Sequence, residues 1–515
     1  MPRSRRDLLR AAIWAATAAG ATGLTGGCAS PPGTGPVENG SDATPRRGGT
    51  FRAALTGGGA TESLDPFTGG SPADIIRNDV IFDSLFRLQN GTPAPALATA
   101  AELTADRQSF TLTLRRETTF HDGSELTADD VAYSLRYMSS PERSHPTELS
   151  LYLDLAQPSV VDRYTLRVPL RRPIGDPAML LAAFPGKVIK NGTVTFTPET
   201  AVGTGPYRVE AFAPGRQTRL RRFDSHWDGA PFADTLELTS LSDAQAKVNA
   251  ISTGQVDYAI DIPFTAARIG TTDPDLEIRT AGRHNRTSYA FVLNTGRAPF
   301  DDPRVRRAIR LAIDRQAMVD TVMLGYGSPG NDLFGSGAQY FSAREPLARN
   351  LDTARALLRD AGAEDTEIRI RSTEYEVGFN ASTQLLAEQL GGIGLTVKQD
   401  IVGVAEFFQL DALAAANGVV FAIGPIPLPV TYGRLAAYPS LAPADLDEAL
   451  DTALAATDDL ARAHAWEHLQ DIVFDRGNTV VWGCADTLSI ARKNVAGVRN
   501  LGSAKYPYLG KAGLA

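Results

Sequence analysis

Residues 367–399 read EIRIRSTEYEVGFNASTQLLAEQLGGIGLTVKQ, and this stretch decides the fold class. Apolar and charged residues alternate over Glu367–Arg371, which is typical of a β-strand. A helix with three leucines follows and ends at Gly391. A second strand is expected over Leu395–Gln399. A strand, a helix and a strand in this order predict a parallel pair joined by a right-handed crossover, and therefore an α/β fold.

The rest of the chain continues this alternation of strands and helices. Strands are predicted at Gly49–Leu55, Ser109–Leu114 and Thr165–Pro169. Thr127, with an aspartate three residues later, predicts the start of one helix, and Asp302, with a proline after it, predicts another. The pattern is that of a mixed α/β protein.

The predicted strand ends indicate where a ligand binds. In open α/β sheets, ligands collect beyond the carboxyl ends of the strands. The loops Thr373–Val377 and Gly424–Pro429 follow two such strands, the second being Val419–Ile423. The glycines of loop Gly57–Glu62 would let the backbone approach a ligand closely.

From these loops we select seven candidate binding residues. A tyrosine can stack and hydrogen-bond, and a glutamate can receive a cationic or hydroxyl group. A tryptophan in an apolar run is either a core residue or an aromatic wall of the site. The candidates are Gly58, Glu62, Glu374, Tyr375, Ile423, Gly424 and Trp482.

The first residues predict export. The sequence Ser4–Arg10 is similar to a twin-arginine signal, and an apolar run too short to span a bilayer follows it. Leu24–Cys28 resembles a bacterial lipobox, in which the cysteine is acylated. We expect residues 1–27 to be a signal peptide and residues 28–47, rich in Pro, Gly, Ser and Thr, to be a lipidated flexible tether. The protein would then be lipid-anchored by Cys28 to the outer face of the cytoplasmic membrane, by either the twin-arginine or the general export route.

Composition excludes some partners. The 515 residues, 43% hydrophobic and 21% charged, suffice for two or three domains. The net charge is −8, and removal of residues 1–27, with four arginines and one aspartate, leaves −11. This balance argues against nucleic acid as a partner. Apart from Cys28 there is one cysteine, Cys484, so no disulfide framework is expected.

Several motifs in a fixed order together resemble the family 5 extracellular solute-binding proteins of ABC importers, the group of oligopeptide-, dipeptide- and nickel-binding proteins. The motifs run from residue 48 into the second half of the chain. They are Gly48–Phe51 with Ser63–Pro66, Phe120–Gly123 with Leu126–Val131, Gly203–Tyr207, His226–Pro231, and Pro299–Ile309 with Ala312–Arg315.

The resemblance implies a three-lobed fold of the periplasmic-binding-protein type (type II), in which two lobes close on a cleft and an extra domain is inserted into the first. Lobe I would comprise residues 48–82, 203–285 and 479–515, lobe II residues 83–202, and lobe III residues 286–478. It also implies a monomer without catalysis or cofactor that hands a small solute to an ABC permease in the membrane.

One departure from the family concerns the ligand. Peptide binders of the family carry a tryptophan and an acidic Asp-Pro stretch after the strand that corresponds to Val419–Ile423. Here Gly424–Val430 reads GPIPLPV, without a carboxylate. The amino terminus of a bound peptide would be a buried ammonium without a counter-charge at this turn, which is costly. We therefore expect unmodified free-amine peptides to bind poorly, and an apolar, capped, sugar-like or other organic solute to bind better.

Two other functions remain as alternatives. His464, Glu467 and His468 form an H-x-x-E-H sequence, which could present two zinc ligands and a base from one helix of an exported metallohydrolase. No third ligand is identifiable, so we expect no metal site. A sensory or adhesion lipoprotein that keeps the same fold is the other alternative.

Overall fold

The computed structural model describes residues 36–39, 43–143, 147–184, 186–438, 442–443, 445–502 and 504–515. The expected signal peptide and Cys28 lie outside these residues. None of the helices in the described ranges has both the length and the apolar character that crossing a membrane requires.

Eight strands of the described chain form the first sheet, in the order β1-β13-β20-β12-β2-β11-β10-β9. β2 lies between β12 and β11 and is parallel to both, whereas β20 is antiparallel to its neighbours. The strands are β1 (Val37–Glu38), β2 (Thr50–Leu55), β9 (Tyr207–Ala213), β10 (Gln217–Arg222), β11 (Thr235–Ser240), β12 (Tyr258–Ile260), β13 (Leu276–Thr280) and β20 (Leu488–Arg492).

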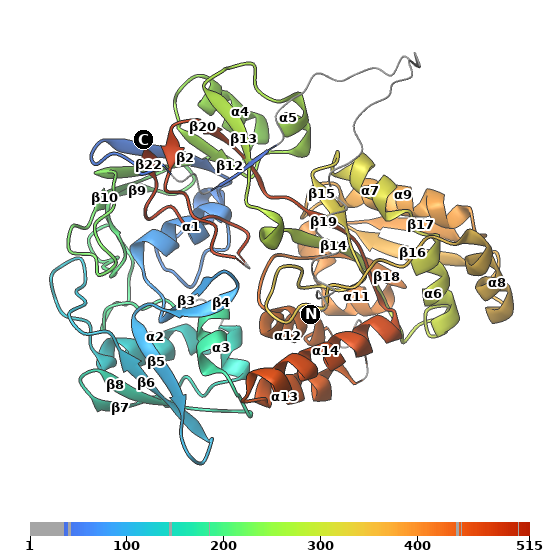
Figure 1. Cartoon of the computed structure of the whole chain (residues 1–515), viewed down its shortest axis with the longest axis horizontal. Coiled ribbons are helices and arrows are strands. Elements are labelled where there is room, and N and C mark those ends of the chain that lie inside the picture. The colour runs from blue at the N-terminus through green and yellow to red at the C-terminus, as the bar shows by residue number, and fades with distance from the viewer. Residues whose placement is uncertain are drawn as a thin grey trace, which may run out of the picture. The chain divides into compact units, whose positions relative to one another are not determined.

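A second sheet has the order β15-β19-β14-β18-β16-β17 within the described ranges (Figure 1). Its strands are β14 (Thr287–Leu293), β15 (Gly327–Pro329), β16 (Glu367–Ser372), β17 (Thr396–Ile401), β18 (Gly418–Ile423) and β19 (Thr479–Ala485). All seven residues of β14 and all seven of β19 are buried, so these two strands form the centre of this part of the core.

Smaller sheets complete the described strands. An antiparallel sheet has the order β5-β6-β8-β7, and two further sheets have two antiparallel strands each, β3–β4 and β21–β22. These strands are β3 (Phe86–Gln89), β4 (Thr92–Pro95), β5 (Ala98–Leu103), β6 (Ser109–Leu114), β7 (Ser159–Asp162), β8 (Thr165–Pro169), β21 (Val495–Ala496) and β22 (Gly513–Leu514).

Helices fill the segments between the strands. The α-helices are α1 (Pro72–Ile81), α2 (Ala128–Ser139), α3 (Pro177–Ala183), α4 (Ala244–Ser252), α5 (Phe264–Ile269), α6 (Pro303–Ala312), α7 (Arg315–Val322), α8 (Leu351–Ala361), α9 (Phe379–Gly391), α10 (Val404–Phe407), α11 (Leu410–Ala415), α12 (Leu428–Ala436), α13 (Leu446–Ala455) and α14 (Asp459–Arg476). Short 3-10 turns occur at Gly59–Thr61, Glu148–Leu151 and Arg283–Asn285.

The sequence predicted the central βαβ unit correctly. β16 and β17 pair in parallel, with Ile370 opposite Gln399, and α9 lies between them in the chain. The predicted helix starts are also correct. Asp130 accepts hydrogen bonds from the backbone N–H and the hydroxyl of Thr127, and Asp302 accepts one from the N–H of Arg304.

Two expected boundaries are wrong. The tether was expected to run to residue 47, but β1 pairs in parallel with β13 from Val37 onward, and the Asn39 amide donates to Tyr258 Oη at 2.8 Å. The tail was expected to return to the first lobe from Thr479. β19 instead belongs to the second sheet, antiparallel to β14, so the return follows Ala485. The other lobe limits stay a prediction.

The two large sheets are joined by two crossings of the chain, at residues 281–286 and 486–487. An ion pair connects these crossings, with Arg286 Nε 2.6 Å from Asp486 Oδ1. The Asn285 side chain adds two hydrogen bonds between these segments. Its Nδ2 donates to the Ala281 carbonyl at 2.7 Å, and its Oδ1 accepts from the Ala504 N–H at 3.2 Å. The crossings and the C-terminal tail are therefore tied to one another.

His121 fixes the segment that leads into β9. The Gly203 N–H lies 3.2 Å from His121 Nδ1, and His121 Nε2 lies 2.9 Å from the Gly205 carbonyl oxygen. An N–H donor on one side and a carbonyl acceptor on the other require the neutral imidazole with its proton on Nε2. Burial lowers the pKa of His121 to about 4, since the hydrogen bond to Gly205 compensates only in part.

We predict that His121 makes folding sensitive to acid. The folded pKa lies below the unfolded value, so the unfolded chain binds the proton more readily, and stability falls as the pH drops from about 6.5 to about 4. The loss reaches about 3 kcal/mol at the acid end. Urea unfolding at a series of pH values should show a weaker acid dependence for His121→Gln. His468→Gln, at an exposed position on α14, should follow the wild type.

Candidate functional site

Three neighbouring cavities lie at the ends of strands and along the chain crossings. The central one, of about 430 Å³, is walled by Ile75 and Asp79 of α1, by Glu376 and Ile426 after β16 and β18, and by tail residues around Lys505. A larger one of about 890 Å³ shares Arg87, Leu501 and Tyr508 with it and reaches residues 281–285. A smaller one of about 90 Å³ shares Glu376 and Lys505 and is walled by Asp261 and Tyr289. Volumes of a few hundred Å³ suit a small organic ligand.

The position of these cavities follows from the topology. Asp261 comes directly after β12, Glu376 follows β16, and Ile426 follows β18. β12 is parallel to β2, and β18 is parallel to β16. The cavity wall is therefore built at the carboxyl ends of parallel strands, where such sheets present ligands.

An ion pair stands where the central and the small cavity meet. Lys505 Nζ lies 2.9 Å from Glu376 Oε1 and 3.2 Å from Oε2, and the Tyr289 hydroxyl donates to Oε2 at 3.4 Å. Each of the two charged side chains is 23% exposed. Burial disfavours the ammonium, but the charges of Glu376, Tyr506 and Asp261 together raise the pKa of Lys505. Lys505 is therefore charged at neutral pH.

The other acidic groups on the central wall have partners on their own side. Lys187 Nζ lies 2.6 Å from Asp79 Oδ1. Asp83 accepts from the Trp227 indole at 2.8 Å and lies 3.2 Å from His226 Nε2. Burial tends to raise the pKa of Asp83, but its contacts with His226, Arg87 and Trp227 outweigh burial and lower it. These groups hold the wall together.

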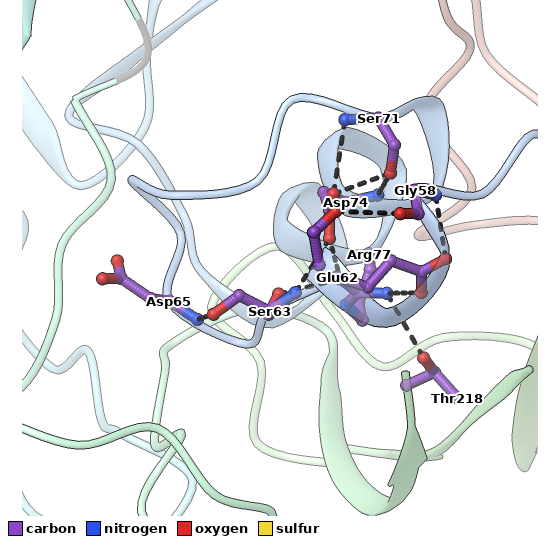
Figure 2. A network of polar contacts seen from close by, with 9 residues as sticks. Gly58, Glu62, Ser63, Asp65, Ser71, Asp74, Arg77 and Thr218 are labelled. Atoms are coloured by element: carbon purple, nitrogen blue, oxygen red, sulfur yellow. Dashed lines mark hydrogen bonds and ion pairs between the residues drawn. The ribbon is translucent and has the colours of Figure 1, made fainter. Parts of the chain in front are cut away.

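Gly58 and Glu62 belong to one polar network, in which Gly58 is exposed and Glu62 is buried (Figure 2). Glu62 Oε1 accepts from the Gly58 N–H at 3.1 Å, and Arg77 donates to Glu62 Oε2 at 3.2 Å. Arg77 also donates to the Asp74 carboxylate. Ser71 is the N-cap residue of α1: its hydroxyl donates to the same carboxylate and accepts from the Asp74 N–H. Glu62 is 5% exposed, so its carboxylate is used to anchor α1.

Glu374 and Tyr375 shape the loop after β16. Glu374 accepts from the N–H groups of Gly378 and Asn380 at the start of α9. The Tyr375 hydroxyl accepts from the Ala422 N–H at 2.7 Å, which joins this loop to β18. The next residue, Glu376, is the one on the cavity wall. Glu374 and Tyr375 stay predicted binding residues, and their loop also carries a cavity residue that the sequence analysis did not select.

The remaining candidates are mostly internal. Trp482 is fully buried, and its ring packs edge-on against Tyr289 at 5.7 Å between centroids. It therefore supports a cavity residue and is not itself a wall. Ile423 is 4% exposed. Gly424 is partly exposed and precedes Ile426, the apolar member of this turn that does line the central cavity.

The structure also changes the expectation about a free amine. The turn after β18 has no carboxylate, as the sequence showed, but Glu376 lies on the same cavity. The turn alone therefore does not exclude a ligand with an ammonium group. Sequence reasoning missed Glu376, Lys505, Tyr506 and Tyr508. The cluster Lys505-Tyr506-Pro507-Tyr508, basic and aromatic, was the available signal for the last three.

The H-x-x-E-H residues lie on the last α-helix of the described chain. His464, Glu467 and His468 are exposed on α14. Among the residues that the structure describes, no group of three or more His, Cys, Asp or Glu side chains could hold a metal ion. Nothing in the geometry favours the metallohydrolase alternative.

Residues 92–420 match the profile of the bacterial extracellular solute-binding proteins, family 5 Middle. This match covers more than half of the chain, and the protein belongs to this family. A relative is the glutathione-binding protein GsiB of Salmonella choleraesuis (strain SC-B67), 28% identical over 351 residues, which are 65% of this chain and 66% of the relative. The similarity thus spans just under two thirds of that relative's length.

Solved structures share the fold. NikA from Brucella suis in complex with Fe(III)-EDTA superposes with a TM-score of 0.78 at 18% identity, covering 90% of this chain and 100% of that chain. The periplasmic binding protein DppA from Helicobacter pylori in complex with the peptide STSA has a TM-score of 0.73 at 18% identity, covering 91% and 98%. The expected family and periplasmic-binding-protein fold are confirmed.

We predict that the Glu62 network is structural. Arg77→Leu leaves two buried carboxylates, Glu62 and Asp74, without their guanidinium. Breaking a buried ion pair in this way costs about 3–5 kcal/mol. Urea unfolding should report this loss, whereas Arg219→Ala, which removes surface ion pairs on β10, should leave the midpoint unchanged. Equal midpoints for the two variants would place Glu62 outside the fold-stabilising network.

Proposed function

We propose that this protein is an exported receptor that captures a small peptide-like or other organic solute and delivers it to an ABC import permease. Membership of family 5 supports this function. Its relatives are solute-binding proteins and not enzymes, and GsiB is named for binding glutathione. The solute and the permease of this chain are part of the proposal.

One observation carries the proposal. The central cavity is walled on one side by α1 and the tail, and on the other by the loops after β16 and β18. The two sides belong to different sheets, joined by the crossings at 281–286 and 486–487. Crossings of this kind act as hinges that absorb backbone changes when two parts close on a ligand. A solute in this cavity would contact both sides.

Native mass spectrometry of the purified protein tests the function. A bound small molecule should be released under denaturing conditions and should rebind to the stripped protein with one-to-one stoichiometry. Import assays in cells that lack the chain should show reduced uptake of the same molecule. Unchanged uptake would contradict a transport role, and this outcome would favour a sensory or adhesive one.

The same closure predicts an effect for Gly175, which contacts the segment 454–456 and is not among the residues that line the central cavity. Its N–H donates to the Leu454 carbonyl at 2.6 Å, and a Cβ built at Gly175 would lie 1.8 Å from the Ala456 carbonyl oxygen. Any side chain there opposes this contact. Overpacking of this kind costs about 1–3 kcal/mol.

Gly175→Val should therefore weaken binding of the co-purified solute by roughly ten- to a hundredfold, because the closed arrangement carries the cost. Titration calorimetry measures this change. Gly70→Val, at a position with open space around the Cβ, is the control and should bind like the wild type. Identical affinities for the two variants would show that solute binding does not require the contact at Gly175.

A lipid anchor at Cys28 belongs to the same proposal. It is supported by the order of Arg5-Arg6, the apolar run and Cys28 in the sequence. A lipoprotein anchor with several acyl chains holds a protein firmly, whereas a single chain binds reversibly. The described chain joins the first sheet at Val37, so the tether would be residues 28–36.

We predict that Cys28→Ala moves the protein from the membrane fraction to the soluble fraction, because the acylation site is lost. Cell fractionation followed by immunoblotting measures the distribution. Ser30→Ala, two residues away, should remain in the membrane fraction. If the Cys28 variant also stays there, the anchor is not at this cysteine.

A further inference from the structure

The Lys505–Glu376 ion pair differs in its surroundings from the sealed ion-pair cluster around Asp332. Arg310, Arg315 and Asp332 are packed together with side-chain exposures of 5%, 4% and 0%. Lys505 and Glu376 instead lie at the border of two cavities and keep 23% exposure each. The first group is sealed, whereas the pair has space next to both of its members.

The pair also joins the two sides of the cavity. Glu376 belongs to the loop between β16 and α9, on the second sheet. Lys505 belongs to the tail, which is tied to Asn285 by the Ala504 N–H and packs through Tyr508 and Leu509 into the core of the first sheet. Asp79 and Lys187, by contrast, pair on one side of the cavity. A solute that spans both cavities would have to separate Lys505 from Glu376.

We propose that Glu376 is the acceptor for an ammonium group of the solute, and that the Lys505 side chain occupies this position until the solute displaces it. This inference rests on the proposed function and names the class of solute, an amine such as a peptide with a free N-terminus. Lys505 then acts as an internal competitor for the ammonium position.

Asp261 gives the displaced lysine a second partner. It lines the same small cavity as Glu376 and Lys505, and the hydrogen bond to its carboxylate from Thr56 is long, at 3.4 Å. The hydrogen bonds of the neighbouring Lys247 go to other acceptors. Its ammonium donates to the Thr56 hydroxyl and to the backbone carbonyls of Ile260 and Asp261. These three bonds use all of its donors. Lys247 still acts on Asp261 through its charge, whereas Lys505 is in direct contact with a carboxylate of this cavity and lies within reach of a second one.

The rest of the central cavity fits the body of such a solute. Ile75, Phe86, Ile426 and Leu501 offer apolar surface next to the ion pair. Tyr289 donates to one oxygen of Glu376, and the acceptor positions that Lys505 uses would be open to an incoming ammonium once the lysine leaves. The long, flexible stem of a lysine allows the ammonium to move while the backbone stays in place. The site therefore suits a small amine with an apolar part.

Calorimetry with paired probes tests the inference. The probes are a library of unmodified di- and tripeptides and the same library after N-acetylation. The wild type should bind members of the first library and not of the second. Glu376→Gln should lose at least about tenfold in affinity, since the acceptor charge is gone. Lys505→Met should gain about tenfold, because a competitor that holds the position about nine-tenths of the time leaves about one tenth of the molecules able to bind, and the apparent affinity falls to that fraction.

Controls separate this effect from folding. Lys493→Met and Glu364→Gln change the same residue types at exposed positions and should bind like the wild type. Lys505→Arg keeps the positive charge and should restore the weaker affinity. Thermal midpoints without probe show whether each variant is folded.

Three results would overturn the inference. Weaker binding by Lys505→Met would mean that Lys505 holds an anionic group of the solute. Equal binding of acetylated peptides would mean that no ammonium is recognised. Binding of a co-purified solute without an amine, together with no binding of either library, would reject the amine class and leave the receptor function intact. The absence of any solute would instead reject the proposed function.

Discussion

The two crossings between the sheets are the constraint on which the site depends. The chain passes from β13 to β14 and later returns from β19 to β20, and the Arg286–Asp486 ion pair holds the two passages together. Asn285 ties the tail to the same place through Ala504. Lys505 is the next residue after Ala504. Its distance from Glu376 therefore depends on the backbone conformation of the two crossings. A change at the hinge is therefore also a change in the charge pairing inside the cavity.

The fold could be predicted from the sequence where periodicity and caps act over short distances. The residues of β16, α9 and β17 carry a strand-helix-strand pattern that leaves little choice of topology, and the structure has the parallel pair. β19 could not be assigned in the same way. All seven of its residues are buried, and a continuous apolar strand fits the interior of either sheet equally well. Its pairing with β14 is a long-range fact that local sequence does not contain.

The site shows the same division at the level of single residues. Strand-end reasoning selected the loop after β16, in which Glu374 and Glu376 have the same chemistry. The first turn of α9 has unpaired N–H groups that need an acceptor, and Glu374 satisfies two of them. The Tyr375 hydroxyl accepts a hydrogen bond from the Ala422 N–H. Glu376 is the member left for the cavity. Its partner Lys505 is 129 residues away in the sequence, and no local pattern connects the two.

Two kinds of enclosed ion pair in the described chain have different consequences. Arg77 with Glu62 and Asp74, and Asp332 with its two arginines, are sealed and fully committed to the fold. Lys505 and Glu376 neutralise each other at a place where space remains. An uncompensated carboxylate in an enclosed cavity would be costly, and the lysine removes that cost in the absence of solute. The consequence is selectivity, since a neutral solute cannot replace the lost ion pair, whereas a cation returns the charge pairing that it breaks.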